Sequence, residues 1–371
     1  MNKIQFDRLL KPLVQIYDDI ELELIRNILL RIENYSGIEG SLEWYLDKLN
    51  ESKLLTNDNL KVIKKNKKEI YKIIKNIIDK GSHSSEYLDT LETYFKDEKL
   101  DINPNTLYKG NSFNRVVENA LKDVSDITDL INSKALESAE KNYKEIINKA
   151  YVETASGLYT YQESIRKALN EFAKQGIDVV HYDNGRTLGI EAVVRRDVIT
   201  RVNKLVGDID LQNAEELGTD LVYVDQHLGA RTRTPYMKED YEAHAEWQGK
   251  VYTINPNNKD YPNFYEATGY GEMLGLKGIN CYHSFRPFFE WEDVPKRINE
   301  KENAKQYELL QQQRAFERKI RSIKRQKVVA NKEDTKNLNK RLKSANSLFN
   351  KYLEEKDLTR DYSREYIGTK K

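Results

Sequence analysis

The chain contains few cysteines, prolines and tryptophans, the residues that form disulfides, interrupt helices and fill cores with large rings. Its 371 residues include one cysteine, seven prolines and three tryptophans. A single cysteine excludes an intramolecular disulfide, so a disulfide-stabilised scaffold is not expected. No apolar run approaches the ~20 residues of a transmembrane helix, and the first residues lack the apolar core of a signal peptide. We therefore expect a protein with no membrane segment that stays in the cytoplasm of the cell that makes it.

Apolar residues are also sparse, and the charges are unevenly distributed. Hydrophobic residues make up 39% of the chain and charged residues 33%, with a mean hydropathy of -0.78. The net charge of +1 conceals a split, because residues 293–371 carry 22 Lys and Arg against 12 Asp and Glu, which leaves residues 1–292 at -9. The basic end favours a polyanionic partner such as DNA, or an acidic protein surface.

Residues 1–175 have apolar side chains at steps of three and four, the spacing of one helix face. A helical bundle or an extended array of helices is therefore expected. A turn is predicted at Asn103-Pro104-Asn105. The predicted helices cover about 6–37, 57–79, 84–96, 116–150 and 161–174.

Residues 176–292 change character and predict a small α+β domain. Apolar and β-branched segments flank Asn184-Gly185, the favoured pair for a tight turn, so a β-hairpin is expected over 177–190. A high content of Pro, Asn, Gly and Tyr predicts a long irregular loop over 255–278. The other expected elements are a helix over 191–217 and strands over 220–224 and 250–254.

Residues 293–371 predict a long, charged helical arm whose apolar stripe is too thin to bury a core alone. Residues 314–343 hold 12 Lys and Arg against three acids. Two interpretations remain open, a solvated face of a coiled-coil-like arm and a surface that contacts DNA. The candidate DNA-contacting residues are Arg314, Arg318, Lys319, Arg321, Lys324, Arg325 and Lys327.

The fold class predicted for the whole chain is thus α+β, with three segments. These are a helical N-terminal region (1–175), a small central α+β domain (176–292) and a basic helical C-terminal arm (293–371). An autonomous DNA-binding regulator is disfavoured, because the body is acidic and no helix-turn-helix pattern stands out.

The scarce residue types concentrate between Val224 and Trp291, which contains three of the five histidines, the cysteine and two of the tryptophans. Three motifs follow one another there: 225–231 (DQHLGAR), 244–252 (HAEWQGKVY) and 278–284 (GINCYHS). This series resembles the tailed-phage minor capsid protein 2 family, relatives of the MuF-like head morphogenesis proteins. The resemblance covers roughly 178–290. It departs from the family at Tyr282, where Arg is usual, and in a charged insert over 232–243.

The resemblance implies a non-enzymatic virion component that works inside or beside the procapsid during head assembly. Its expected partners are the portal protein, other capsid proteins and packaged double-stranded DNA. Its expected location is the capsid interior at the portal vertex, after assembly in the host cytoplasm. The motif residues expected to have structural roles are Arg231, Trp247, Gln248, Gly249, Gly278 and Asn280.

Two kinds of chemistry are open to His227, His244, Cys281 and His283. Imidazole and thiolate are the ligands that tetrahedral zinc prefers, and a Cys-x-His pair can supply two of them. The gaps of 17 and 37 residues between these positions match no common zinc finger. The alternative is that Cys281 is a small buried hydrophobe and that the histidines bind loop carbonyls.

A Cys/His-centred enzyme, or an effector ejected from the phage head, is the competing functional class. Cys281 would be its nucleophile, with His244 or His283 as the base. Residues two apart point to the same side of a strand, but neither a third orienting residue nor an oxyanion loop is recognisable. The sequence therefore favours a non-enzymatic protein.

Overall fold

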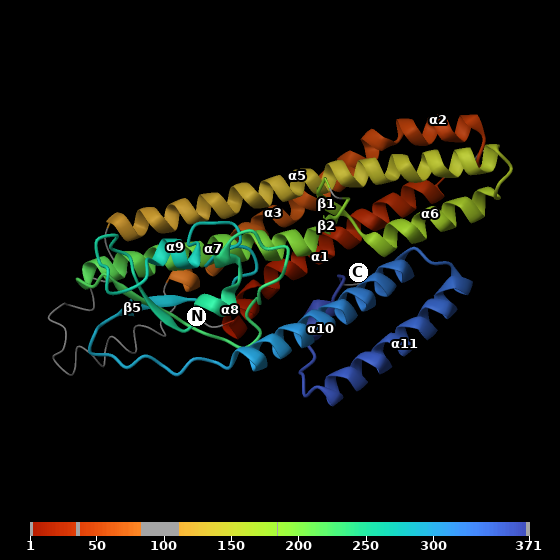
Figure 1. The fold of residues 1–371 in the computed structure, drawn as a ribbon. Helices are drawn as coiled ribbons and strands as arrows, with labels where there is room; N and C mark the ends of the chain where they lie inside the picture. Colours follow the sequence, from red (N-terminus) through yellow and green to blue (C-terminus); the bar gives the residue numbers. More distant parts are fainter. Residues whose placement is uncertain (1–2, 35–37, 83–110, 184, 369–371) are drawn as a thin grey trace. The chain divides into compact units, whose positions relative to one another are not determined.

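The computed structural model describes residues 3–34, 38–82, 111–183 and 185–368 (Figure 1). Most of these residues are helical. No helix among them is long and apolar enough to cross a membrane. The longer helices are α1 (Lys3–Glu33), α2 (Leu42–Asn50), α3 (Ser52–Ser82), α5 (Asn111–Ala155), α6 (Tyr161–Gln175), α7 (Ile190–Glu216), α10 (Glu300–Val328) and α11 (Lys332–Glu355).

Helix periodicity identified most of these elements. Helices α1, α3, α5, α6 and α7 confirm the predicted ones, and the apolar positions predicted to face inward on α1 are buried from Leu10 to Ile32, except for the half-buried Ile16. Helix α2 was not predicted. Its buried side chains are Trp44 and Lys48, whereas Leu42 and Leu46 are exposed, so its apolar spacing does not mark its inner face. The helix predicted over 84–96 and the turn at 103–105 lie outside the described residues.

Contacts group the chain into two compact units, each built from three separated segments. The first contains Met1–Leu10, Lys72–Ile127 and Arg195–Gln311, and the second contains Lys11–Tyr71, Thr128–Val194 and Gln312–Lys371. This grouping follows packing rather than chain order. The division of the chain after residues 175 and 292 stays a prediction.

The second unit is helical apart from one small hairpin. Strands β1 (Asp178–His181) and β2 (Thr187–Gly189) pair antiparallel, which confirms the hairpin predicted around the Asn-Gly pair. Gly185 has a φ of +79°, the left-handed conformation that this turn requires.

The C-terminal arm is a hairpin of two helices with its own apolar cluster. Its fully buried members come from both α10 and α11, which lie side by side in Figure 1. Each helix contributes a thin stripe, and the two stripes together form a core that one stripe could not. The short 3-10 helix η3 (Tyr362–Glu365) follows. The buried residues of this cluster are Ile320, Ile323, Leu338, Ala345, Phe349 and Leu353.

The first unit contains a three-stranded antiparallel sheet in the order β4-β3-β5. Strands β3 (Leu221–Val224) and β4 (Lys250–Thr253) were predicted, whereas β5 (Phe285–Phe288) was not. Strand β5 contains Pro287 and lies at a sheet edge, the position where proline is tolerated in a strand, but proline weakens a strand pattern in the sequence. The segment predicted as an irregular loop contains a short helix, α9 (Phe264–Thr268).

Both faces of this sheet are buried. Val222 and Val224 point into a cluster with Trp247, Phe264 and Cys281, and the alternate residues of β3 join a second cluster on the other face. All four residues of β3 are buried, as expected for a central strand covered on both sides. The sheet therefore gives the loops at its ends a rigid base.

Candidate functional site

The sheet brings the three sequence motifs together at one end. Val224, the last residue of β3, pairs with Lys250 at the start of β4 and with Phe285 at the start of β5. Both neighbours run antiparallel to β3, so the segment that follows β3 and the segments that precede β4 and β5 meet at the same end of the strands. These segments are the three motifs. Strand register therefore unites residues that are up to 59 positions apart, such as Asp225 and Ser284.

Three of the four predicted metal-ligating residues form a compact buried cluster. One potential ligand atom each from His244, Cys281 and His283 lies within 4.8 Å of the other two. The exposed fractions of these three residues are 1%, 0% and 1%. His227 stands beside them, with its ring stacked on that of His283 at a centroid distance of 4.3 Å. The short helix α8 (His244–Trp247) presents His244 from its first position.

Hydrogen bonds determine which ring nitrogens carry protons. Nε2 of His244 lies 2.9 Å from the carbonyl oxygen of Leu274, and Nε2 of His283 lies 2.9 Å from Oε1 of Gln248. The backbone N–H of His227 also donates to that Gln248 oxygen at 3.0 Å, which establishes the orientation of the amide. Because both oxygens can only accept, each Nε2 donates its proton, and Nδ1 of each ring keeps a lone pair.

Burial keeps this cluster uncharged at neutral pH. It lowers the pKa of His244 to about 3, and the nearby Arg231 guanidinium acts in the same direction. Burial also holds the pKa of His283 well below its usual value. The pKa of the Cys281 thiol is raised, again chiefly by burial. Without a metal the cluster is therefore two neutral imidazoles and a thiol, with Sγ of Cys281 3.6 Å from Nδ1 of His283.

Two motif side chains connect the loops that surround this cluster. The Arg231 guanidinium donates to the carbonyl oxygens of Leu274 at 3.1 Å and Ile279 at 2.6 Å, which ties the first motif to the third. Trp247 is buried, packs its ring 4.7 Å from those of both His244 and His283, and donates from Nε1 to the Tyr241 carbonyl. Both residues therefore position the loops around the cluster.

At three further motif positions the residue type suits the local backbone. Gly249 has a φ of +69°, and Asn280 a φ of +56°, both in the left-handed region. At Gly278 an added Cβ would lie 2.5 Å from the carbonyl oxygen of Met273, so only glycine fits there without a shift. These residues shape the turns that carry Gln248 and Cys281 into the site.

Other residues that support the site were less visible in the sequence. Asn203 on α7 donates to the Cys281 carbonyl at 2.7 Å, which joins the helix to the third motif. Asn303 on α10 was missed. Its amide makes two hydrogen bonds with the backbone of Ala230, at 2.9 and 3.0 Å. A lone asparagine in a charged helix has no pattern that could have revealed this contact.

The geometry gives little support to Cys281 as an enzyme nucleophile. A reactive cysteine is partly exposed and has a lowered pKa, whereas Cys281 has an exposed fraction of 0% and a raised pKa. The second ring nitrogen of His283 binds the neutral amide of Gln248, not a carboxylate. Such a thiol is protonated and shielded from a substrate.

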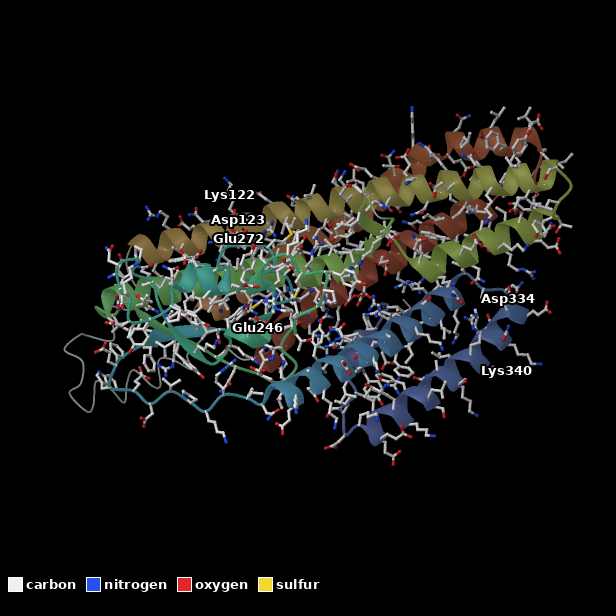
Figure 2. All side chains as sticks on the ribbon, in the orientation of Figure 1. Lys122, Asp123, Glu246, Glu272, Asp334 and Lys340 are labelled. Atoms are coloured by element: carbon white, nitrogen blue, oxygen red, sulfur yellow. The ribbon has the colours of Figure 1, made fainter. Side chains whose placement is uncertain are left out.

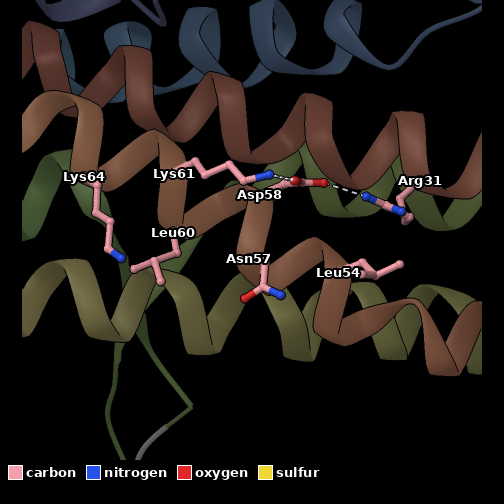
Figure 3. A pocket seen from close by; sticks show the side chains of 7 residues that line it. All are labelled: Arg31, Leu54, Asn57, Asp58, Leu60, Lys61 and Lys64. Carbon is pink, nitrogen blue, oxygen red and sulfur yellow. Dashed lines mark hydrogen bonds and ion pairs between the residues drawn. The ribbon is translucent and has the colours of Figure 1, made fainter.

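A pocket of about 410 Å³ lies elsewhere, in the helical unit (Figure 3). It contains none of the motif residues. Its Asp58 carboxylate is already paired with Arg31 at 2.5 Å and with Lys61 at 2.9 Å. The pocket is open to solvent, and the one carboxylate that lines it is already paired with two cations. The residues that line it are Arg31, Leu54, Asn57, Asp58, Leu60, Lys61 and Lys64.

Four of the seven candidate DNA-contacting residues are engaged inside the protein. Arg321 is buried and pairs with Asp18 at 2.7 Å. Arg314 pairs with Glu317, Lys324 donates to the Glu365 carbonyl, and Arg325 donates to carbonyls at the end of α6. Among the other three, Arg318 and Lys319 are exposed and Lys327 is half-buried.

The exposed positive charge of the arm continues on α11. Lys336, Lys340 and Lys343 are exposed and follow a spacing of four and three residues, which places them on one helix face. Figure 2 labels Lys340, whose side chain points away from the hairpin. These three lysines form an outer row on the hairpin. This outer row is available to a polyanion, whereas the inner face of α10 is not.

Comparisons with known proteins show which family the chain belongs to. A structural protein of Lactococcus phage LL-H is 26% identical over 364 residues, which cover 93% of this chain and 94% of that protein. A structural protein of Lactococcus phage mv4 is 37% identical over 118 residues, which cover 30% of this chain and 95% of that protein. No solved structure matches significantly. The family model described as phage minor capsid protein 2 matches residues 1–354, and the chain therefore belongs to the phage minor capsid protein 2 family.

Proposed function

We propose that this protein is a non-enzymatic virion component that binds the portal and acts in the procapsid interior during head assembly. The observation that carries the proposal is the family match over residues 1–354, which spans both compact units. A role in assembly therefore belongs to the chain as a whole. The shielded Cys281 thiol supports a structural role over an enzymatic one, because a nucleophile must reach its substrate.

Portal binding is tested by comparing heads assembled with and without portal protein. Quantitative mass spectrometry would measure the amount of this protein relative to the major capsid protein in purified particles. We expect the protein to be incorporated in a few copies when the portal is present and to be lost when it is absent. Equal incorporation into portal-free particles would show that the capsid lattice recruits it instead, and would remove portal binding from the proposal.

DNA contact is the second part of the proposal, and the outer row of the hairpin would provide it. Its lysines Lys336, Lys340 and Lys343 are exposed and lie along about two turns of α11. A row of this kind can neutralise phosphates without reading sequence, and it releases their counterions. Binding to packaged DNA would then be sequence-independent and strongly dependent on salt.

Fluorescence anisotropy with a labelled duplex tests this contact in the full chain. The wild type should bind at ~50 mM salt and lose most of its affinity by ~200 mM, and replacing the three lysines by alanine should abolish most binding. The matched control replaces the exposed Lys64, Lys68 and Lys72 of α3, which removes the same charge elsewhere. Equal losses in both triple variants would indicate only a net-charge effect, and the DNA contact would have to be abandoned.

A further inference from the structure

The buried cluster at this end of the sheet brings the donor atoms of a candidate metal site close together. Sγ of Cys281 and Nδ1 of His283 are 3.6 Å apart, close to the roughly 3.5 Å that separates a thiolate and an imidazole ligand on tetrahedral zinc. The ligand atoms of His244, Cys281 and His283 all lie within 4.8 Å of one another, so small movements bring the third donor into the same sphere.

The partners of the ring nitrogens match those of metal-bound histidines. Such a histidine usually donates its other N–H to a carbonyl, carboxylate or amide oxygen, which orients the ring toward the metal. His244 does so through Leu274, and His283 does so through Gln248, each at 2.9 Å. The lone pairs that remain belong to the two Nδ1 atoms. The arrangement therefore orients two ring nitrogens for coordination before any ion is bound.

His227 is the fourth candidate donor, and it lies beside the three clustered residues rather than among them. Its ring stacks on His283 with a centroid distance of 4.3 Å, and its Nδ1 lies 3.1 Å from the carbonyl oxygen of Leu228. With Nδ1 donating to that oxygen, Nε2 is the nitrogen that would coordinate an ion. We propose that His227, His244, Cys281 and His283 form a zinc site, which ties together the loops at the end of β3 and at the starts of β4 and β5.

Three buried donors with a half-buried fourth would define a structural site rather than a catalytic one, because four protein ligands leave no position for water or substrate. Binding would convert the Cys281 thiol to a zinc-bound thiolate and release its proton to solvent. Cys281 and His283 lie on one short segment, whereas His227 follows β3 and His244 begins helix α8. The ion would thus cross-link three segments that the sheet alone joins only through short strands. This inference does not depend on portal or DNA binding.

The wild-type full chain provides the first test, with zinc and cobalt ions as the probes. After dialysis against metal-free buffer, elemental analysis should find about one zinc per chain, and a strong chelator should lower the Tm by several degrees. Addition of Co²⁺ to the chelated protein should produce the absorption of a tetrahedral site with one thiolate ligand. Metal-free protein that shows neither cobalt absorption nor a chelator effect would overturn the proposal.

Variants then assign the ligands. Cys281→Ser should remove the thiolate-to-cobalt charge-transfer band, and His244→Ala should weaken zinc binding by at least tenfold. His181→Ala is the matched control, since His181 is exposed on β1 and lies outside the cluster. Circular dichroism of each variant in chelator checks that the fold persists. Zinc retained at full stoichiometry in both Cys281→Ser and His244→Ala would place the metal elsewhere and refute this site.

Discussion

The edge of the β4-β3-β5 sheet and the α10–α11 hairpin both bury titratable side chains, but they use them differently. At this end of the sheet His244, Cys281 and His283 are neutral, and one potential ligand atom from each lies within 4.8 Å of the other two. In the hairpin the buried Arg321 is a cation whose donors are taken by Asp18 and by the Tyr366 carbonyl. The first region thus buries neutral groups, whereas the second buries a charge together with its partner.

This difference shows that buried neutral side chains and buried charged side chains obey different physical requirements. A buried cluster of neutral groups has a small desolvation penalty, so it can exist in the folded protein before a ligand binds. A buried cation must be paired at once, because an unpaired charge in the interior is very unfavourable. The exposed basic side chains of the hairpin are free of that requirement. The following variants test both halves of the comparison.

The largest expected effect is in the hairpin. Arg321→Ala would leave the fully buried Asp18 carboxylate without its cation, and it should lower the free energy of unfolding by about 3–5 kcal/mol. Arg318→Ala, which removes an exposed arginine three residues away, should change it by less than about 0.5 kcal/mol. Denaturant titration measures both. Similar small effects in the two variants would mean that Arg321 is not held internally.

A second pair of variants tests whether the hairpin has a core of its own. Leu353 is 6% exposed and packs in the apolar cluster, whereas Leu348 on the same helix is 53% exposed. Leu353→Ala should therefore destabilise the protein by about 2–5 kcal/mol, and Leu348→Ala by less than about 0.5 kcal/mol. Thermal denaturation is the measurement. An arm that was only a solvated helix would show no difference between these two leucines.

At the sheet edge a smaller effect is expected from Gln248. Its side-chain oxygen accepts from both the His227 backbone and the His283 ring, so Gln248→Leu leaves two buried N–H groups without this acceptor. The cost should be about 1–3 kcal/mol, measured in chelator to exclude any metal. Gln311→Leu, at an exposed position of α10, is the control and should be nearly neutral. A neutral Gln248→Leu would show that the amide does not hold the cluster.

The smallest effect is a change in pH dependence. Burial lowers the pKa of His244 from 6.5 to about 3, so the unfolded chain binds more protons in this window. The contribution of His244 to stability is fully present above pH ~6.5 and is lost as the pH falls toward 3. His244→Gln in chelator should therefore reduce the slope of unfolding free energy against pH by about 1.4 kcal/mol per unit near pH 5.

Other groups do not obscure this comparison. Burial raises the pKa of Asp210 to about 7, which favours the folded state as the pH falls and opposes the effect of His244. Both proteins contain Asp210, so its contribution cancels in the difference between their slopes. His181→Gln, at an exposed position, should keep the wild-type slope. An unchanged slope in His244→Gln would mean that His244 is not buried as a neutral ring.

The sequence predicted elements wherever local physics decides the structure. Helices with long apolar stripes, the Asn-Gly hairpin and the apolar strands β3 and β4 follow from periodicity and turn chemistry, which act over a few residues. It failed at α2, whose buried face carries a lysine, and at β5, which contains a proline. In both places contacts with distant segments outweigh local preference. The motif order was enough to indicate the family.

The sequence by itself determined which side chains were available for chemistry, namely three clustered histidines, one cysteine and a basic C-terminal end. Only the tertiary structure decided how they are used. Antiparallel pairing of β4 and β5 with β3 brings the histidines and the cysteine to one buried edge, because strand register acts across the chain. Helix packing turns Arg321 inward to Asp18 and leaves Lys340 outside. A count of charges cannot tell these two positions apart, since burial is set by neighbours remote in sequence.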